Sequence, residues 1–146
     1  MRTDWLRFAA AILAGIAAWG LAFFVLAILL ARLWPEYGEH GRTWMRDGVF
    51  TFDSTMAACN LLLWLSSDML AGGLGRSIAG RPSATLTLAL LITGYLALVH
   101  FALNWELFPW WYNLGVVLPA FPATILGGRI AGRWARRSAT PASQNS

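Results

Sequence analysis

Hydrophobic residues in this chain fall into four long runs that are separated by short polar segments. The runs cover about residues 6–33, 49–73, 84–105 and 112–130. Each is close to or longer than the roughly 20 apolar residues that a helix needs to cross the ~30 Å hydrocarbon core of a bilayer. The pattern predicts an all-α membrane protein, a bundle of four transmembrane helices that forms a single domain over residues 1–137. The polar residues 138–146 predict a disordered C-terminal tail.

Composition supports this class and excludes several others. Of the 146 residues, 58% are hydrophobic and only 12% are charged, and most of the charges lie between the apolar runs. The chain has one cysteine, Cys59, so no disulfide can form within it. The basic residues lie beside the runs, where membrane topology accounts for them. We therefore expect lipid as the surroundings, with no nucleic-acid partner and no cofactor.

The arginines predict the orientation. Residues 36–48 form the longest polar connection between runs and carry charges of both signs. Eight of the eleven basic residues flank the opposite side of the membrane. Positive residues mark the cytoplasmic side, so both termini are predicted in the cytoplasm of a bacterial inner membrane. The eight residues are Arg2, Arg7, Arg76, Arg81, Arg129, Arg133, Arg136 and Arg137.

Two similar octets follow the second and fourth runs. Residues 74–81 read LGRSIAGR and residues 126–133 read LGGRIAGR, which agree at six positions. Each octet comes after a helix that is predicted to end on the same side. We interpret the pair as a duplicated two-helix hairpin, which would give two parallel repeats about an axis along the membrane normal. Chance similarity among small residues and arginine is the alternative.

Small residues recur along the first run. They are spaced four residues apart, which places them on one helical face where another helix can approach closely. This ridge predicts helix packing, and we expect the protein to self-associate or to bind other membrane proteins. The residues are Ala10, Ala14, Ala18 and Ala22.

Polar side chains inside the second and third runs form the candidate site. Asp53 and Asn60 are seven residues apart in the second run, and Asp68 follows them. Such groups are costly in hydrocarbon, so they are functional candidates by default. Matching depths at 1.5 Å per residue place Asp53 close to the level of His100. The candidate polar intramembrane site comprises Asp53, Asn60, Thr93, His100 and Asn104.

The candidate residues allow three interpretations. An Asp53–His100 pair in a low dielectric would suit a proton relay, because each partner shifts the pKa of the other. The same pair would also supply half of a metal site. The third interpretation is structural, with an interhelical hydrogen bond at this pair and another at Asn60. Asp68 lies about one turn from the predicted cytoplasmic boundary, where a pairing with Arg76 or Arg129 would also be structural.

No familiar catalytic motif is present. The chain has no GxSxG, HExxH or CxxC sequence and no phosphate-cradling glycine loop. No catalytic, cofactor-binding or metal-binding residue is therefore assigned. We expect a non-enzymatic accessory or structural protein of the membrane. The alternative is a small oligomeric transporter or channel with a polar path along the second and third spans.

The predicted topology can be tested with reporter fusions. A reporter fused after Arg81 or after Arg133 should report the cytoplasm, because eight arginines hold that side of the chain inside. A reporter placed within residues 36–48 should report the outside. An external signal after Arg133 would contradict the four-span topology and the parallel repeat together.

Overall fold

The computed structural model describes residues 2–138, which are almost entirely helical. The predicted tail lies outside the described residues from position 139 onward. Within the described part, five α-helices are joined by short connections, and a π-helix and a 3₁₀ turn separate the last two. The elements are α1 (Arg2–Leu33), α2 (Pro35–Asp47), α3 (Ser54–Ala79), α4 (Pro82–Ala97), the π-helix (Leu98–Leu103), the 3₁₀ turn (Trp105–Leu107) and α5 (Trp110–Ser138).

Four helical segments are long and apolar enough to cross a membrane, which confirms the predicted class of fold. They are Asp4–Leu33, Ser54–Ala79, Pro82–Leu103 and Trp110–Ser138. The third combines α4 with the π-helix. All four correspond to the apolar runs of the sequence, although their ends differ from the predicted ones by up to several residues.

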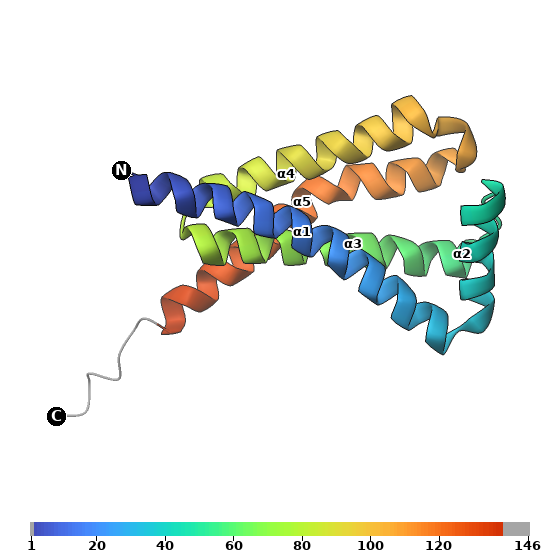
Figure 1. Cartoon of the computed structure of the whole chain (residues 1–146), viewed down its shortest axis with the longest axis horizontal. Helices are drawn as coiled ribbons and strands as arrows, with labels where there is room; N and C mark the ends of the chain where they lie inside the picture. The colour runs from blue at the N-terminus through green and yellow to red at the C-terminus, as the bar shows by residue number, and fades with distance from the viewer. Residues whose placement is uncertain (1, 139–146) are drawn as a thin grey trace.

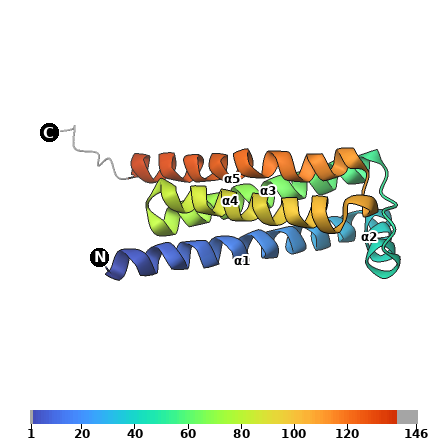
Figure 2. The same cartoon turned by 90° about the horizontal axis from the view of Figure 1, so that it is seen from above.

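Helix α3 lies at the centre of the bundle. It packs most extensively against α5 and α1, and Figure 2 shows these two helices on opposite sides of it. The main hydrophobic core joins α3, α4 and α5 through residues such as Ala57, Ile92 and Val116. Figure 1 shows that α1 begins at the same end of the bundle at which α5 ends. That end holds the α3–α4 turn and is called the arginine-rich end below.

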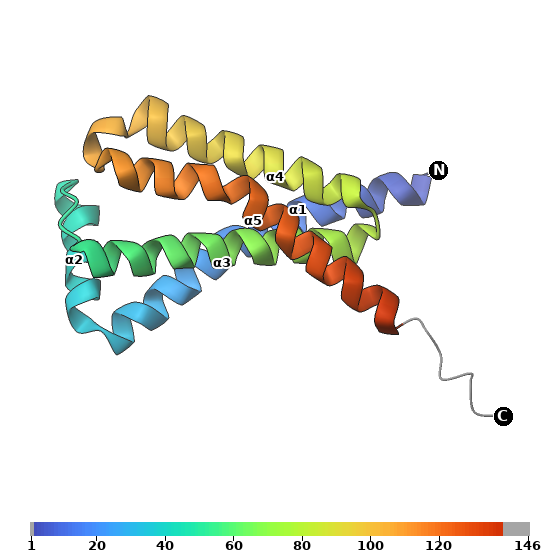
Figure 3. The same cartoon turned by 180° about the vertical axis from the view of Figure 1, so that it is seen from behind.

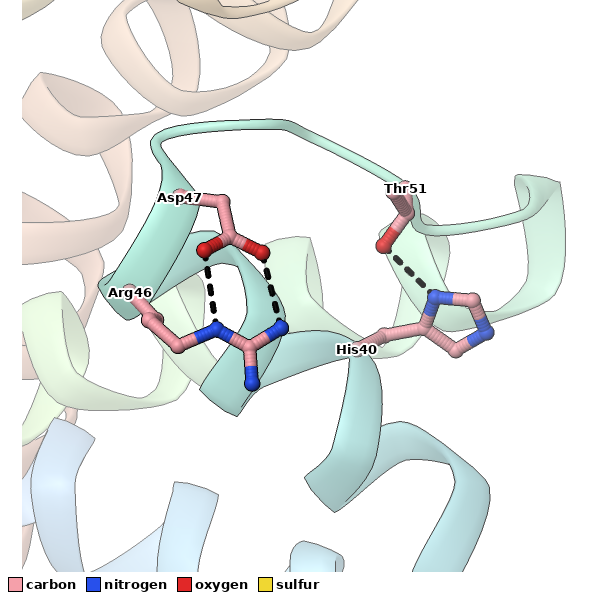
Figure 4. A network of polar contacts seen from close by, with 4 residues as sticks. All are labelled: His40, Arg46, Asp47 and Thr51. Atoms are coloured by element: carbon pink, nitrogen blue, oxygen red, sulfur yellow. Dashed lines mark hydrogen bonds and ion pairs between the residues drawn. The ribbon is translucent and has the colours of Figure 1, made fainter.

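Helix α2 lies crosswise at the opposite end, called the α2 end below (Figure 1). The sequence pattern predicts only a polar connection over residues 36–48, but this segment folds as a helix. Pro35 occupies the first turn, where its missing N–H costs nothing, and Gly48 ends the helix with a positive φ of 67°. His40 bonds Thr51 Oγ1 at 2.6 Å, and Arg46 contacts Asp47 through two hydrogen bonds (Figure 4).

The boundaries of α3 follow from local capping. The apolar run begins at Val49, but the helix begins at Ser54 because Asp53 is its N-cap and accepts a hydrogen bond from the Met56 N–H at 2.8 Å. The helix continues past residue 73 to Ala79. Gly80 then adopts a φ of 68°, and Pro82 starts α4.

The two octets therefore have different structures. The first forms the end of α3 and the turn that follows, whereas the second lies wholly inside α5. The difference follows from what comes next. Pro82 restricts Arg81 to extended backbone, whereas Arg133 is followed directly by Trp134 and α5 continues to Ser138.

Helices α3 and α5 meet backbone to backbone. A Cβ atom at Gly72 would collide with the carbonyl oxygen of Thr124, and one at Gly127 would collide with that of Met69. Both glycines are buried. The absence of side chains at these positions is what permits the close approach.

Helix α1 is more peripheral. In an 18-residue apolar stretch of α1 only 6% of the residues are buried, compared with 33% in α3 and 39% in α5. Its buried positions include Ala11 and Gly15, and a Cβ at Gly15 would contact Leu88 of α4. Of the predicted alanine ridge, Ala10 is exposed, and Ala14, Ala18 and Ala22 are partly buried. The closest packing in the monomer is therefore centred one residue away from that ridge.

Helix α5 contains two prolines, Pro119 and Pro122. Each removes a backbone N–H donor and crowds the preceding turn, which bends helices. Figure 3 shows α5 changing direction part-way along its length. The bend carries the last turns of α5 away from α4 and across α3.

The backbone contact predicts an unusual response to alanine. Alanine normally stabilises a helix relative to glycine by about 0.5–1 kcal/mol. Gly72→Ala should instead destabilise the protein by about 1–3 kcal/mol, because the methyl group overpacks against Thr124. Gly94→Ala is the matched control, since a Cβ there meets nothing within 4 Å. Melting in detergent measures both. Equal melting temperatures for the two variants would contradict the close α3–α5 contact.

Candidate functional site

Asn60 connects three helices at the α2 end of the bundle. Its Nδ2 donates a hydrogen bond to Tyr37 Oη of α2 at 2.6 Å. Its Oδ1 accepts one from Tyr112 Oη of α5 at 2.6 Å. All three residues are buried. The amide thus uses both of its polar atoms, and α2, α3 and α5 are joined through a single side chain.

Tyr37 lies in α2, outside the membrane-spanning segments. Burial raises the pKa of its hydroxyl above the ordinary value of about 10, and the hydrogen bond from Asn60 opposes part of that change. The hydroxyl therefore stays protonated at neutral pH and keeps accepting from Asn60. A neutral, uncharged network results.

Aromatic rings enclose this network. Tyr37 stacks on Phe52 with ring centroids 5.1 Å apart, and Tyr112 stacks on Phe108 at 5.3 Å. Phe50 lies between the two pairs, 5.2 Å from Phe52 and 4.9 Å from Tyr112. Residues 49–53, which the apolar pattern assigns to a span, thus cover the end of the bundle with aromatic side chains.

His100 forms a second polar contact in the same region. Its Nδ1 lies 2.8 Å from Asn113 Oδ1 of α5. Asn113 Nδ2 donates to the carbonyl oxygens of Trp105 and Phe108, at 3.2 and 3.3 Å. These two bonds fix the orientation of the amide, so Oδ1 faces His100 and the imidazole donates from Nδ1. His100 and Asn113 thereby hold the turn between α4 and α5.

The π-helix sets the position of His100. At the end of the π-helix, the Asn104 N–H donates a hydrogen bond to the carbonyl oxygen of Val99, five residues earlier, at 2.9 Å. Helical spacing predicts that Thr93, His100 and Asn104 share one stripe, but a π-turn shifts the side chains that follow it around the helix axis. Asn104 lies just after the π-helix and is partly buried. Thr93 Oγ1 is buried, with no hydrogen-bond partner among residues 2–138.

The structure gives Asp53 and His100 separate partners. Asp53 caps α3 and is exposed, whereas His100 is buried and bonds Asn113. Of the five candidate residues, Asn60 and His100 have hydrogen-bond partners on other elements. Asp53 supports its own helix, and Thr93 and Asn104 bond neither of these side chains.

A buried carboxyl group lies deeper in the bundle. Asp68 has no exposed surface, and its Oδ1 accepts a hydrogen bond from Trp19 Nε1 of α1 at 2.9 Å. Its Oδ2 is buried, with no partner in the described part of the chain. Trp19 is held by ring contacts with Trp64 and Tyr95, at 5.6 and 5.7 Å between centroids.

Sequence reasoning placed Asp68 near an arginine and missed this pair. The predicted end of the second run at residue 73 hid the pair, because the depths of Trp19 and Asp68 match only when α3 extends to Ala79. Trp19 lies about 13 residues from the start of the first run, and Asp68 lies about 11 residues from the end of α3. At 1.5 Å per residue the two reach similar levels of the bundle. An indole N–H and a carboxyl oxygen are complementary donor and acceptor.

No metal site is formed within residues 2–138, where no three His, Cys, Asp or Glu side chains are grouped to hold an ion. Comparison of the chain with protein-family models, curated proteins and solved structures finds no match. Function must therefore be argued from the geometry alone. The polar groups at the α2 end connect helices, and Asp68 provides the single fully buried carboxyl group in the described segments.

The Asn60 connection can be measured with a double-mutant cycle. Asn60→Ala and Tyr112→Phe each remove one side of the same hydrogen bond. Their effects on the free energy of unfolding should therefore be non-additive, with a coupling of about 0.6–1.7 kcal/mol. Tyr95→Phe in place of Tyr112→Phe is the control, because Tyr95 has no hydrogen bond to Asn60. Additive effects in the first cycle would show that the bond contributes nothing to stability.

Proposed function

We propose that this chain is a small multi-pass protein of a bacterial inner membrane, with both termini in the cytoplasm, that acts as a non-enzymatic structural or accessory component. The observation that carries the proposal is the Tyr37–Asn60–Tyr112 connection. Asn60 is saturated by neighbouring helices, and His100 is bonded to Asn113. Such groups hold helices together through hydrogen bonds, whereas a transport path needs polar groups that face water.

The exposed face of α1 supports a role in assembly. Leu13, Leu21, Phe24 and Ile28 are each more than half exposed in the monomer. Lipid covers such a face in a bilayer, and helices of a second copy or of another membrane protein cover it equally well. We propose that α1 is the helix through which the chain self-associates or binds its partners.

A duplicated hairpin is the proposed origin of the fold. The octets of α3 and α5 are 52 residues apart, and the bonded pair Asn60 and Tyr112 has the same separation. So do Gly72 and Thr124, which meet at the helix crossing. Equivalent positions of two parallel repeats face each other near a two-fold axis, so these pairs support a parallel repeat with α2 as an insertion in the first hairpin.

A transporter that carries protons is the second candidate, and Asp68 is the observation that favours it. An ionisable group buried in a membrane bundle marks proton pathways in many pumps and transporters. Oδ2 of Asp68 has no partner among the described residues, so no hydrogen bond within that range occupies the oxygen that would carry the proton. Trp19 would hold the other oxygen in place during the exchange.

The two candidate functions predict different effects on proton flux when a titratable side chain is replaced. In proteoliposomes with an imposed pH gradient, the structural proposal expects no dissipation by the wild type, by Asp68→Asn or by Asp53→Asn. Dissipation by the wild type that Asp68→Asn abolishes would contradict it and support the transporter. Asn matches the shape of Asp but cannot titrate, so the fold is preserved.

Asp53 provides a stability control in the same experiment. Asn is as good an N-cap as Asp, so Asp53→Asn should change the free energy of unfolding by less than about 0.5 kcal/mol. Asp53→Ala should lower it by about 0.5–2 kcal/mol, because the Met56 N–H loses its acceptor. A similar loss in both variants would mean that the carboxylate acts through its charge.

A further inference from the structure

A cavity of about 530 Å³ lies at the arginine-rich end of the bundle. It is bounded by the last turns of α3, the first turn of α4 and the second half of α5. Four of its eleven lining residues are arginines, and none is acidic. The arginines are Arg76, Arg129, Arg133 and Arg136.

Three of these four arginines have no compensating charge among the described residues. Arg76, Arg129 and Arg133 have no ion pair with any residue of the described range 2–138. The nearby Asp4 is already paired with Arg81, at 3.5 Å. Concentrated positive charge beside a low-dielectric bundle attracts anions more strongly than the same charge spread over a surface.

Two buried polar atoms in the wall point to a ligand. Thr85 is only 4% exposed, and its Oγ1 has no hydrogen-bond partner within the described residues. Nη1 of Arg76 is buried and unpartnered in the same way. Both residues line the cavity. A buried unpartnered polar group costs free energy, and native structures satisfy such groups with protein, water or a bound molecule.

The first turn of α4 adds further donors. Pro82 and Ser83 line the cavity, so the N-terminal end of this 16-residue helix faces it. The N–H groups of a first helical turn have no intrahelical acceptor, and the helix dipole favours negative charge there. Here the helix end, Thr85 and three arginines converge on one space.

Glycines of the second octet let α5 pack closely against the Thr85 and Arg76 side chains that line the cavity. A Cβ at Gly128 would collide with the Thr85 side chain, and one at Gly132 would lie 3.1 Å from Arg76 Nε. The first octet supplies Arg76, and the second supplies Arg129 and Arg133. Membrane orientation requires arginines at this end, but it requires neither a cavity nor an Arg76 whose Nη1 atom is buried. The octets therefore build a site in addition to setting topology.

We propose that this cavity binds a phosphate group, either on the headgroup of an anionic phospholipid or on a soluble phosphate compound. Arginine guanidinium groups and helix N-termini are the donors that recognise phosphate. Basic pockets between membrane helices bind phospholipid headgroups in the same way. The site does not depend on the accessory or transport role of the protein.

The test is ligand-dependent melting of the full chain in dodecyl maltoside. Four probes are added at matched ionic strength: dioleoylphosphatidylglycerol, dioleoylphosphatidylcholine, glycerol 3-phosphate and inorganic phosphate. Binding to the folded state stabilises it by RT ln(1 + L/Kd), where L is the free ligand concentration, so the melting temperature rises with the logarithm of that concentration once it exceeds Kd. We expect phosphatidylglycerol or the soluble phosphates to raise it in the wild type, and phosphatidylcholine to have little effect.

Variants locate the site. Arg129→Gln should weaken the apparent affinity about tenfold, the effect of losing one charged hydrogen-bonding partner. Arg76→Gln should do the same, but Arg76 is partly buried, so the exposed Arg129 keeps the test valid if the Arg76 variant fails to fold. Arg137→Gln is the matched control, because it removes the same charge from the same helix outside the cavity lining.

A shift with phosphatidylglycerol alone would identify the ligand as a lipid headgroup. A shift with glycerol 3-phosphate or inorganic phosphate would identify a soluble phosphate compound. Equal shifts with phosphatidylcholine and phosphatidylglycerol would overturn the proposal. It would also be overturned by an absence of any shift, or by an equal loss of affinity in Arg137→Gln and Arg129→Gln.

Discussion

Helices α3 and α5 can touch backbone to backbone because Gly72 and Gly127 present no side chain where they cross. In a membrane the hydrophobic effect does not drive helices together, so close packing and interhelical hydrogen bonds must do so. The crossing also sets the distances at both ends of the bundle. It brings Asn60 within reach of Tyr112 on one side, and on the other it leaves Arg76 facing Gly132.

The two ends of the bundle differ in how their polar groups are satisfied. At the α2 end, Asn60 and His100 bond to other side chains and are enclosed by aromatic rings. At the arginine-rich end, Thr85 and Arg76 keep unpartnered polar atoms beside a cavity. The first arrangement is complete without further molecules. The second leaves buried polar atoms without a protein partner beside a cavity lined by arginines, which is why we propose binding at that end.

The sequence predicted the four spans well, because apolar run length is a direct consequence of bilayer thickness. It also predicted that Asn60 would need a partner. It did not predict α2, although Pro35 and Gly48 are start and stop signals of a helix. A hydropathy reading overlooks a polar helix of this kind. The π-helix left no signal in the spacing, although a π-turn shifts the residues that follow it, such as Asn104, around the helix axis.

The Trp19–Asp68 pair shows a second limit of prediction from the sequence. Periodicity reports which face of a helix a residue occupies, but not which neighbouring helix covers that face. The predicted partner of Asp68 was Arg76 or Arg129, whereas its hydrogen-bond donor comes from α1, 49 residues earlier. Only the helix arrangement could decide between these partners. The cavity at the arginine-rich end required the same information, since its walls come from three helices.

The positions of Trp19 and Tyr37 also bear on how the chain enters the membrane during synthesis. A chain is made from its N-terminus, so α1 and α2 exist before α3 emerges. The donor for Asp68 and the acceptor for the Asn60 amide are therefore both available when these two polar residues of α3 reach the lipid. Tyr112 is synthesised later and donates the remaining hydrogen bond to Asn60. The order of the helices along the chain thus shortens the time for which either residue of α3 is exposed to hydrocarbon without a partner.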